Sequence, residues 1–419
     1  MNDKTIANGL VPELRFREFE KPWEEKRLGE FMNFKNGINA GKEQYGHGRK
    51  FINVLDIISD EPIVYERIIG SVDVPDKEFD KNEVLYGDIL FQRSSEIREE
   101  AGQANVYLDK SKSATFGGFV IRGRAIAKIN PIYLNLLLKT APVRKEVTTK
   151  SGGSTRFNVG QETLGSVKVV VSGDELEQEK VAAFLTSIDE KLKKLRRKHE
   201  LLGSYKRGLM QKVFSQQVRF KNSDGAEFPD WKLVAFREVF SRVTSRNKEN
   251  NKNVLTISAQ KGLVNQEEYF NKSVSAQDVS GYYLLEKNDF AYNKSYSKGY
   301  PMGAIKRLTK YDKGVVSTLY ICFRAKSSDE NGFYEQYFNS GLQNRELHKI
   351  AQEGARNHGL LNMSVVEFFS DVQIPRPNVD EQKKIAAFLN DFDQKIEAVA
   401  KQVEQLDAFK KGLLQKLFV

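Results

Sequence analysis

The feature that most constrains this chain is a segment that occurs twice. Residues 177–214 align without a gap with residues 381–418, which lie 204 positions later, and 17 of the 38 aligned positions are identical. Unrelated sequences of ordinary composition would match at roughly one position in fifteen. The aligned stretches include QEKVAAFL against QKKIAAFL and YKRGLMQKVF against FKKGLLQKLF. The chain therefore contains an internal duplication.

Both copies carry apolar residues in two rows with a spacing of seven, a pattern typical of coiled-coil helices. Asp174 with Glu177, and Asn378 with Glu381, have the spacing of a helix-capping box. We therefore expect two helices, each roughly 57 Å long, that pair with each other. In the first copy the rows are Val181, Ile188, Leu195, Leu202 and Leu209, and Leu185, Leu192, His199, Lys206 and Val213.

Three polar residues interrupt these rows. His199 is predicted to pack in the seam between the helices. Lys206 and its counterpart Lys410 place a charge at the same position of both copies. They are predicted to set the register of the helix pair, the alternative being that they extend to solvent.

The composition excludes several classes of protein. A chain of 419 residues exceeds the usual size of one domain, and its net charge of +10 favours a polyanionic partner. A single cysteine, Cys322, excludes a disulfide framework and fits a reducing compartment. The N-terminus lacks a signal-peptide pattern, and no apolar run has the length of a membrane span. We therefore expect a cytoplasmic protein with no membrane partner.

A globular segment precedes each long helix. Trp23 and Trp231, the two tryptophans of the chain, stand where these segments begin and are predicted to anchor their cores. The first segment contains short β-rich runs and one helical stretch near 133–147, and the second repeats this order more loosely. Asp88 and Asp289 occupy matching places 201 residues apart. We expect an α+β fold with a pseudo-twofold internal repeat. Its parts are a first head at 1–173, a helix at 174–215, a second head at 216–377 and a helix at 378–419.

Motifs for catalysis are weak. Gly37–Lys42 is one residue short of a phosphate-binding loop, and Glu43 replaces the Ser or Thr that binds Mg²⁺. Asn130–Tyr133 is similar to the Asn-Pro-Pro-Tyr signature of adenine methyltransferases but lacks the second proline, and it fits a helix start better. The four histidines lack metal-ligand spacing. We therefore expect no catalytic residue and no metal site.

Polar loops at equivalent places in the two heads are the candidates for reading DNA. Arg and Lys suit guanine, Asn and Gln suit adenine, and Ser and Lys suit phosphates. Ordinary polar surface turns remain the alternative for each residue. The candidates are Gln92, Arg93, Ser94, Ser95 and Arg156 in the first head, and Asn293, Lys294, Ser295, Tyr296, Arg356, Asn357 and His358 in the second.

The densest basic run, Lys191–Lys198, lies on the first long helix. Its counterpart, residues 395–402, is nearly neutral, which favours a solvated helix face. Contact with DNA phosphates or with an acidic partner remains open.

The doubled helix pattern, Q-x-K-V/I-A-A-F-L followed by K-R/K-G-L-M/L-Q-K-V/L-F, resembles that of the specificity subunit of type I restriction–modification enzymes. The resemblance covers essentially the whole chain. It implies that the heads are target recognition domains, each reading one half of an asymmetric bipartite DNA site. It also implies that the helices pair antiparallel as a spacer and that the chain itself is not an enzyme.

The resemblance further implies partners. These are double-stranded DNA, two methyltransferase subunits docked at the helix ends, and restriction subunits. S-adenosylmethionine, ATP and Mg²⁺ are expected on those subunits and none of them on this chain. About 30 helical residues between head centres correspond to roughly 45 Å, or about 13 base pairs, so the helices are predicted to set the unread gap. The alternatives are a coiled-coil adaptor that reads no sequence and a DNA methyltransferase with its own cofactor site.

Overall fold

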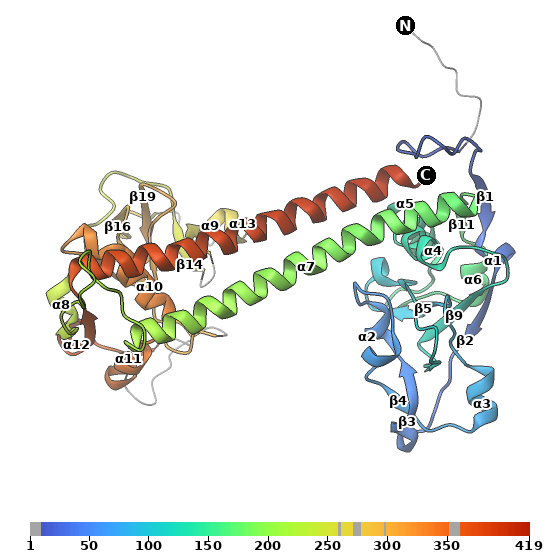
Figure 1. Cartoon of the computed structure of the whole chain (residues 1–419), viewed down its shortest axis with the longest axis horizontal. Coiled ribbons are helices and arrows are strands. Elements are labelled where there is room, and N and C mark those ends of the chain that lie inside the picture. Colours follow the sequence, from blue (N-terminus) through green and yellow to red (C-terminus); the bar gives the residue numbers. More distant parts are fainter. Residues whose placement is uncertain (1–9, 259–260, 271–277, 297–298, 352–360) are drawn as a thin grey trace, which may run out of the picture. The chain divides into compact units, whose positions relative to one another are not determined.

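The fold is described from a computed structural model of the whole chain (Figure 1). It describes residues 10–258, 261–270, 278–296, 299–351 and 361–419. The chain divides into two compact units, and each combines one globular head with part of both long helices. Unit 1 comprises Met1–Arg196 and Lys401–Val419, and unit 2 comprises Arg197–Ala400.

Unit 1 is built on a four-stranded antiparallel sheet with the order β2-β9-β5-β7. Strand β5 is buried along its whole length, and its Ile89 lies opposite Gly123 of β9 and Val106 of β7. A smaller sheet has the order β4-β3-β8, while β1 pairs with β11 and β6 with β10. The strands are β1 (Glu24–Arg27), β2 (Met32–Asn36), β3 (Tyr45–Ile52), β4 (Ser71–Val72), β5 (Ile89–Gln92), β6 (Ser94–Ser95), β7 (Ala104–Val106), β8 (Thr115–Phe116), β9 (Val120–Ala125), β10 (Phe157–Asn158) and β11 (Lys168–Val171).

Short helices surround these sheets. Helix α4 begins where the sequence predicts, because the Asn130 side chain accepts hydrogen bonds from the main-chain N–H groups of Ile132 and Tyr133. The single helical stretch expected near 133–147 is two helices, which are separated at Lys139 and Thr140. The helices are α1 (Leu28–Phe31), α2 (Val54–Ile57), α3 (Asp76–Lys81), α4 (Pro131–Leu138), α5 (Ala141–Lys150) and α6 (Gln161–Gly165), with 3-10 turns at Lys42–Gln44, Tyr65–Arg67 and Arg98–Glu100.

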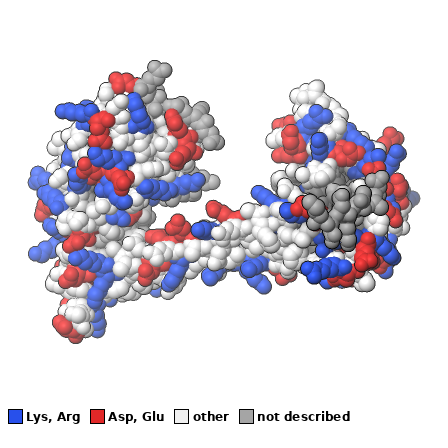
Figure 2. All heavy atoms as spheres, turned by 90° about the horizontal axis from the view of Figure 1, so that it is seen from above, with Lys and Arg blue, Asp and Glu red and all other residues white. Residues whose placement is uncertain are grey.

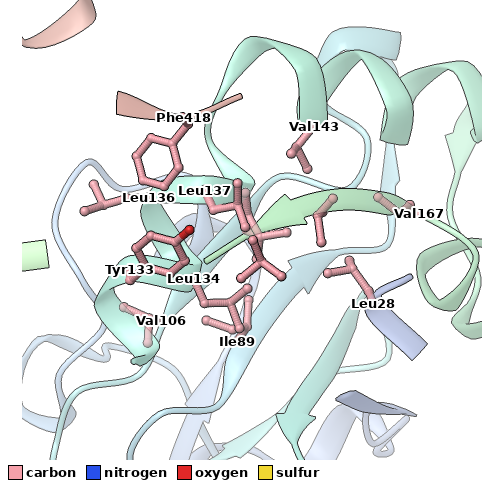
Figure 3. Close-up of a cluster of buried hydrophobic side chains, with 14 of the residues drawn as sticks. Leu28, Ile89, Val106, Tyr133, Leu134, Leu136, Leu137, Val143, Val167 and Phe418 are labelled. Carbon is pink, nitrogen blue, oxygen red and sulfur yellow. The ribbon is translucent and has the colours of Figure 1, made fainter. Parts of the chain in front are cut away.

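The main core of unit 1 joins the head to both long helices. Figure 3 shows Leu134 and Leu137 of α4 among strand residues such as Ile89. Phe418, one residue from the end of the chain, packs on Tyr133 with ring centroids 5.3 Å apart and on Trp23 at 6.0 Å. Trp23 is therefore a core anchor, as predicted.

Unit 2 repeats this plan. Its four-stranded sheet has the order β13-β20-β17-β18, and β12 pairs with β21 as β1 pairs with β11. Further pairs are β14 with β15 and β16 with β19. The strands are β12 (Lys232–Ala235), β13 (Phe240–Arg242), β14 (Leu255–Ser258), β15 (Gly262–Asn265), β16 (Tyr283–Glu286), β17 (Phe290–Asn293), β18 (Ala304–Arg307), β19 (Lys313–Val316), β20 (Ile321–Ala325) and β21 (Gln373–Arg376). The helices are α8 (Phe236–Val239), α9 (Gln266–Phe270), α10 (Asn331–Ser340), α11 (Asn344–Ile350) and α12 (Val365–Ser370), with a 3-10 turn at Ser328–Glu330.

The two long helices, α7 (Glu175–Phe214) and α13 (Val379–Leu417), begin with an N-cap as predicted. Asp174 accepts from the N–H groups of Leu176 and Glu177, and Asn378 accepts from that of Asp380. Among the described residues, the glutamates of the predicted capping boxes bind residues of their heads instead of the N-cap N–H groups, and Asp174 N donates to Ser172 Oγ at 3.1 Å. Glu177 binds Arg15 at 2.6 Å and Trp23 Nε1 at 3.0 Å.

Glu381 repeats this arrangement in unit 2. It accepts hydrogen bonds from Arg219 at 2.9 Å and from Trp231 Nε1 at 2.9 Å. Both glutamate side chains are fully buried, so each buried carboxylate is compensated by an arginine and an indole N–H. Each head is thus hydrogen-bonded to the first turn of the helix that follows it.

The long helices pair antiparallel within each unit. In unit 1, Asp189 and Arg196 of α7 contact Lys410 and Asp407 of α13. In unit 2, Lys206 of α7 contacts Asp393 of α13 at 2.6 Å. Both seam lysines therefore bind aspartates of the facing helix, rather than extending to solvent.

The leucines that face the seam from α7 differ in burial. Leu185 and Leu192 are buried in unit 1, whereas Leu195 and Leu202 are only half-buried. His199 is exposed, so the prediction that it packs in the seam is wrong. In the part of the chain that the structure describes, no helix is long and apolar enough to cross a membrane.

Candidate nucleic-acid interface

In unit 1 the candidate residues meet where strand β5 ends. Arg93 separates β5 from the short strand β6, and β6 pairs with β10 so that Ser94 lies opposite Asn158. Arg156 precedes β10 by one residue. The structure thus brings together two stretches that are more than 60 residues apart in the sequence.

Arg93 is held from two sides by main-chain hydrogen bonds. Its N–H donates to Phe119 O at 2.9 Å, and its carbonyl accepts from Val159 N at 3.0 Å. Its side chain is exposed, and its guanidinium donates to Gly118 O at 3.2 Å. Arg156 is also exposed, with its guanidinium 3.7 Å from Glu96. Two arginine side chains therefore face solvent from this strand end.

Two other candidates face the interior. Gln92 is 5% exposed; its Nε2 donates to Ser94 O, and its Oε1 lacks a hydrogen-bond partner among the described residues. Ser95 is buried, and its hydroxyl donates to Glu100 at 2.8 Å. Ser94 is half-buried. Gln92 and Ser95 therefore occupy places from which they position the loop, while Arg93 and Arg156 are the accessible donors.

An ion pair between a buried aspartate and a partly exposed arginine supports the same strand in both units. Asp88 accepts from Arg124 Nε at 2.8 Å, and Asp289 accepts from Arg324 Nε at 2.5 Å. Each aspartate also accepts from a main-chain N–H three residues before it, that of Leu85 in unit 1. The hydrogen bond to Asp289 raises the pKa of Arg324 above its ordinary value. These pairs fix the turn that leads into β5 and β17, and hence the strand ends that carry the candidates.

In unit 2, Asn293 ends β17 and Lys294 follows it. The Lys294 carbonyl accepts from Leu361 N at 3.1 Å, as that of Arg93 accepts from Val159. Burial lowers the pKa of the Lys294 ammonium below its ordinary value. Asn293 Oδ1 accepts from Ser295 N at 3.0 Å, so it orders the loop. Tyr296 is exposed. The candidates Arg356, Asn357 and His358 lie outside the described residues.

The positive charge of the chain is dispersed. In the view of Figure 2, Lys and Arg side chains alternate with Asp and Glu over each unit. Three cations of the basic run on α7 are paired: Lys193 with Glu61, Arg196 with Asp407, and Arg197 with Glu200. Part of the basic run is therefore neutralised by acidic residues of the same chain, which favours a solvated helix face over a contact with DNA phosphates or an acidic partner. Among the described residues, His, Cys, Asp and Glu form no group that could hold a metal ion.

The sequence pointed to only some of the residues that surround this candidate interface. It missed the turn Gly117–Phe119, whose carbonyls hold the Arg93 side chain and main chain. The glycine pair Gly117-Gly118 predicts a turn, but nothing in the sequence places that turn beside Arg93.

The chain matches one protein-family model twice, the "Type I restriction modification DNA specificity domain", over residues 20–202 and 229–408. Each match includes one head and a large part of the helix that follows it.

Relatives and solved structures of the same kind align over nearly the whole chain. The putative type I restriction enzyme MjaX specificity subunit of Methanocaldococcus jannaschii is 25% identical, over 96% of this chain and 93% of that protein. The MjaVIII specificity subunit of the same organism is 46% identical over 52 residues, or 12% of each chain. The type I S subunit of M. genitalium superposes with a TM-score of 0.56 at 15% identity, covering 98% of this chain and 99% of that one. A chain from a type I R-M system studied for complex assembly gives a TM-score of 0.54 at 16% identity, over 94% and 97% of the two chains.

Proposed function

Because this chain belongs to the family of type I restriction–modification DNA specificity proteins, we propose that it directs a type I complex to an asymmetric bipartite DNA site. Each head reads one half of that site. Members of the family recognise DNA targets and are not themselves catalytic. The chain therefore supplies the sequence reading for chemistry that its partners perform.

One observation carries this proposal: the two units share a framework but differ at the matching strand ends. The Asp88–Arg124 pair of unit 1 recurs as Asp289–Arg324 in unit 2. The residue after the strand is Arg93 in one unit and Lys294 in the other. Two domains that recognise different base sequences need a shared framework and different polar side chains at the position that contacts the bases.

The paired helices are the spacer of this proposal. Helices α7 and α13 are continuous over 40 and 39 residues. In this proposal their length sets the number of unread base pairs between the two half-sites. The assembly on DNA is expected to contain two methyltransferase subunits and restriction subunits, in the cytoplasm. S-adenosylmethionine, ATP and Mg²⁺ belong to those subunits in this proposal.

The test is long-read mapping of methyladenine in cells that contain the partner methyltransferase, with and without this gene. The expected result is an asymmetric bipartite motif that is methylated only when the gene is present. Methylation without any motif, or a motif that persists without the gene, would contradict the proposal. Equilibrium dialysis of the purified chain with labelled S-adenosylmethionine is the companion test. One-to-one binding would favour an independent methyltransferase instead.

A further inference from the structure

Each unit carries a large exposed apolar side chain at the same turn. Phe119 precedes β9 in unit 1 and is 66% exposed, and Leu319 precedes β20 in unit 2 and is 59% exposed. The turns are equivalent by their hydrogen bonds: Val120 N donates to Gly117 O at 2.8 Å, and Tyr320 N donates to Ser317 O at 3.1 Å. Phe119 and Leu319 therefore occupy one backbone position of the repeated fold.

The main chain under Phe119 is fixed by close packing. Gly117 N donates to Ile52 O at 3.1 Å. A Cβ on Gly118 would lie 1.8 Å from Asn39 Oδ1, and a Cβ on Gly117 would lie 2.7 Å from the Phe51 ring. The turn is thus packed closely against its neighbours, since a side chain at residue 117 would displace the buried Phe51 ring and one at residue 118 would displace the Asn39 side chain. A side chain presented on such a rigid turn loses little backbone entropy when it binds.

The turn in unit 2 is held by a hydroxyl group instead. Ser317 Oγ accepts from Leu319 N at 3.3 Å, in addition to the turn hydrogen bond of its carbonyl. Different residues therefore produce the same presentation of an apolar side chain in the two units.

Both turns adjoin the candidate interface. In unit 1 the carbonyl of Phe119 accepts the main-chain N–H of Arg93, and Gly118 O accepts the Arg93 guanidinium. In unit 2, β17 pairs with β20 so that Tyr292 lies opposite Ile321. The turn that holds Leu319 therefore lies at the strand end from which Asn293 and Lys294 emerge.

Exposure of a single apolar residue is ordinary on protein surfaces and would prove nothing alone. Here, however, an exposed apolar residue recurs at one position in both heads, each time beside polar candidates for base reading. This recurrence favours an apolar group on the partner that binds there. Base edges in the major groove of B-DNA present hydrogen-bond donors and acceptors and one apolar group, the C5 methyl of thymine.

We propose that Phe119 and Leu319 are specificity-determining residues, each contacting the C5 methyl group of a thymine in the half-site that its own unit reads. This inference rests on the proposed function and adds a chemical class to it, a 5-methylpyrimidine in each half-site. The residues chosen from the sequence are polar, so Phe119 and Leu319 add the apolar component of recognition.

The experiment uses the full-length chain and its preferred DNA duplex, selected from a randomised pool. Deoxyuridine then replaces each thymine in turn, which removes one methyl group without changing the pairing. Binding is measured for the wild-type chain, Phe119→Ala and Leu319→Ala. One replacement should weaken wild-type binding about fourfold, the value expected for one buried methyl group. The same replacement should have no effect on Phe119→Ala. A position in the other half-site should behave likewise for Leu319→Ala.

Two exposed apolar residues elsewhere serve as matched controls. Ile69→Ala in unit 1 and Leu233→Ala in unit 2 remove side chains that are at least as exposed. Both variants should respond to every deoxyuridine as the wild type does. Because all four side chains are exposed, thermal unfolding should be unchanged in these variants.

Three results would overturn the inference. The first is a selected half-site without thymine, and the second is a deoxyuridine effect of equal size in wild type and Phe119→Ala. The third is a Phe119→Ala variant that keeps its DNA preference but binds the partner methyltransferase less tightly. A wild-type chain that selects no sequence at all would refute the proposed function as well, whereas selection without methyl coupling refutes this inference alone.

Discussion

Lys206 Nζ lies 2.6 Å from Oδ1 of Asp393. Its counterpart 204 residues later, Lys410, lies 2.5 Å from Oδ1 of Asp189, and Asp189 is 204 residues before Asp393. The contact is therefore preserved when the two long helices exchange roles, which is the pattern that a twofold repeat produces. The surroundings differ, because the Lys206 side chain is 9% exposed and that of Lys410 is 24% exposed.

Replacement of Gln336 and of its counterpart Asn135 should have different effects on stability. Gln336 accepts from Lys206 Nζ at 2.8 Å and donates to Asp393 at 2.8 Å, whereas Asn135 Oδ1 is buried without a partner among the described residues. Gln336→Met should lower the free energy of unfolding by about 1–3 kcal/mol, since it leaves a buried charge less well satisfied. Asn135→Leu should change it by less than about 1 kcal/mol. Urea unfolding measures both, and equal losses would contradict the account.

The carboxylate that joins each head to its helix should be essential for stability. Glu177→Gln conserves volume but removes the negative charge that compensates Arg15, whose side chain is largely buried. We expect a loss of about 3 kcal/mol, typical of breaking a buried ion pair, and a similar loss for Glu381→Gln. Glu190→Gln on an exposed face of α7 is the control and should cost less than about 0.5 kcal/mol. If Glu177→Gln lowers the free energy of unfolding by no more than Glu190→Gln does, the contact between the Glu177 carboxylate and Arg15 is not needed for stability.

Removal of the exposed guanidinium at the β5 end should weaken DNA binding. Arg93→Ala should cost about 1–3 kcal/mol and relax selection in one half-site if the side chain reads a base. Uniform weakening across sequences with a smaller salt dependence would instead assign it to a phosphate. Lys26→Ala, on the β1 strand that carries no candidate, is the control. DNA affinity is measured by fluorescence anisotropy. An unchanged affinity of Arg93→Ala for DNA would show that Arg93 does not contact the DNA.

The single thiol should react only after unfolding. Cys322 lies on strand β20 in the sheet of unit 2 and is buried, and this burial raises the pKa of its thiol to about 12. The folded state therefore holds the thiol proton more tightly than the unfolded state does. This component of stability is complete below the unfolded pKa of about 8.5 and is lost as the pH rises towards 12. Iodoacetamide labelling at pH 8 should follow urea unfolding, and rapid labelling without urea would show that the thiol is accessible in the folded chain.

Local and periodic features of the fold were predictable from the sequence. The heptad rows predicted α7 and α13, and Asp174 and Asn378 cap them as expected. The matching of Asp88 with Asp289 also anticipated equivalent roles. These features were readable because each depends on neighbouring residues or on comparison of the two copies.

Contacts between distant residues were not predictable in the same way. Glu177 has the spacing of a capping residue, but it binds Arg15, 162 residues away. At the candidate interface, composition did not distinguish the buried Gln92 from the exposed Arg93. In a continuous strand, successive side chains point to opposite faces of the sheet. The break between β5 and β6 interrupts this alternation, so the pattern does not show which of these residues is buried.

The central claim, that each head reads one half-site, is tested most directly by exchanging one head. Residues 231–377 would be replaced by the corresponding head of a relative with a different target, and methyladenine would be mapped in cells containing the partner methyltransferase. The account predicts that one half of the motif changes while the other half and the gap remain. An unchanged motif, or one altered in both halves, would contradict it.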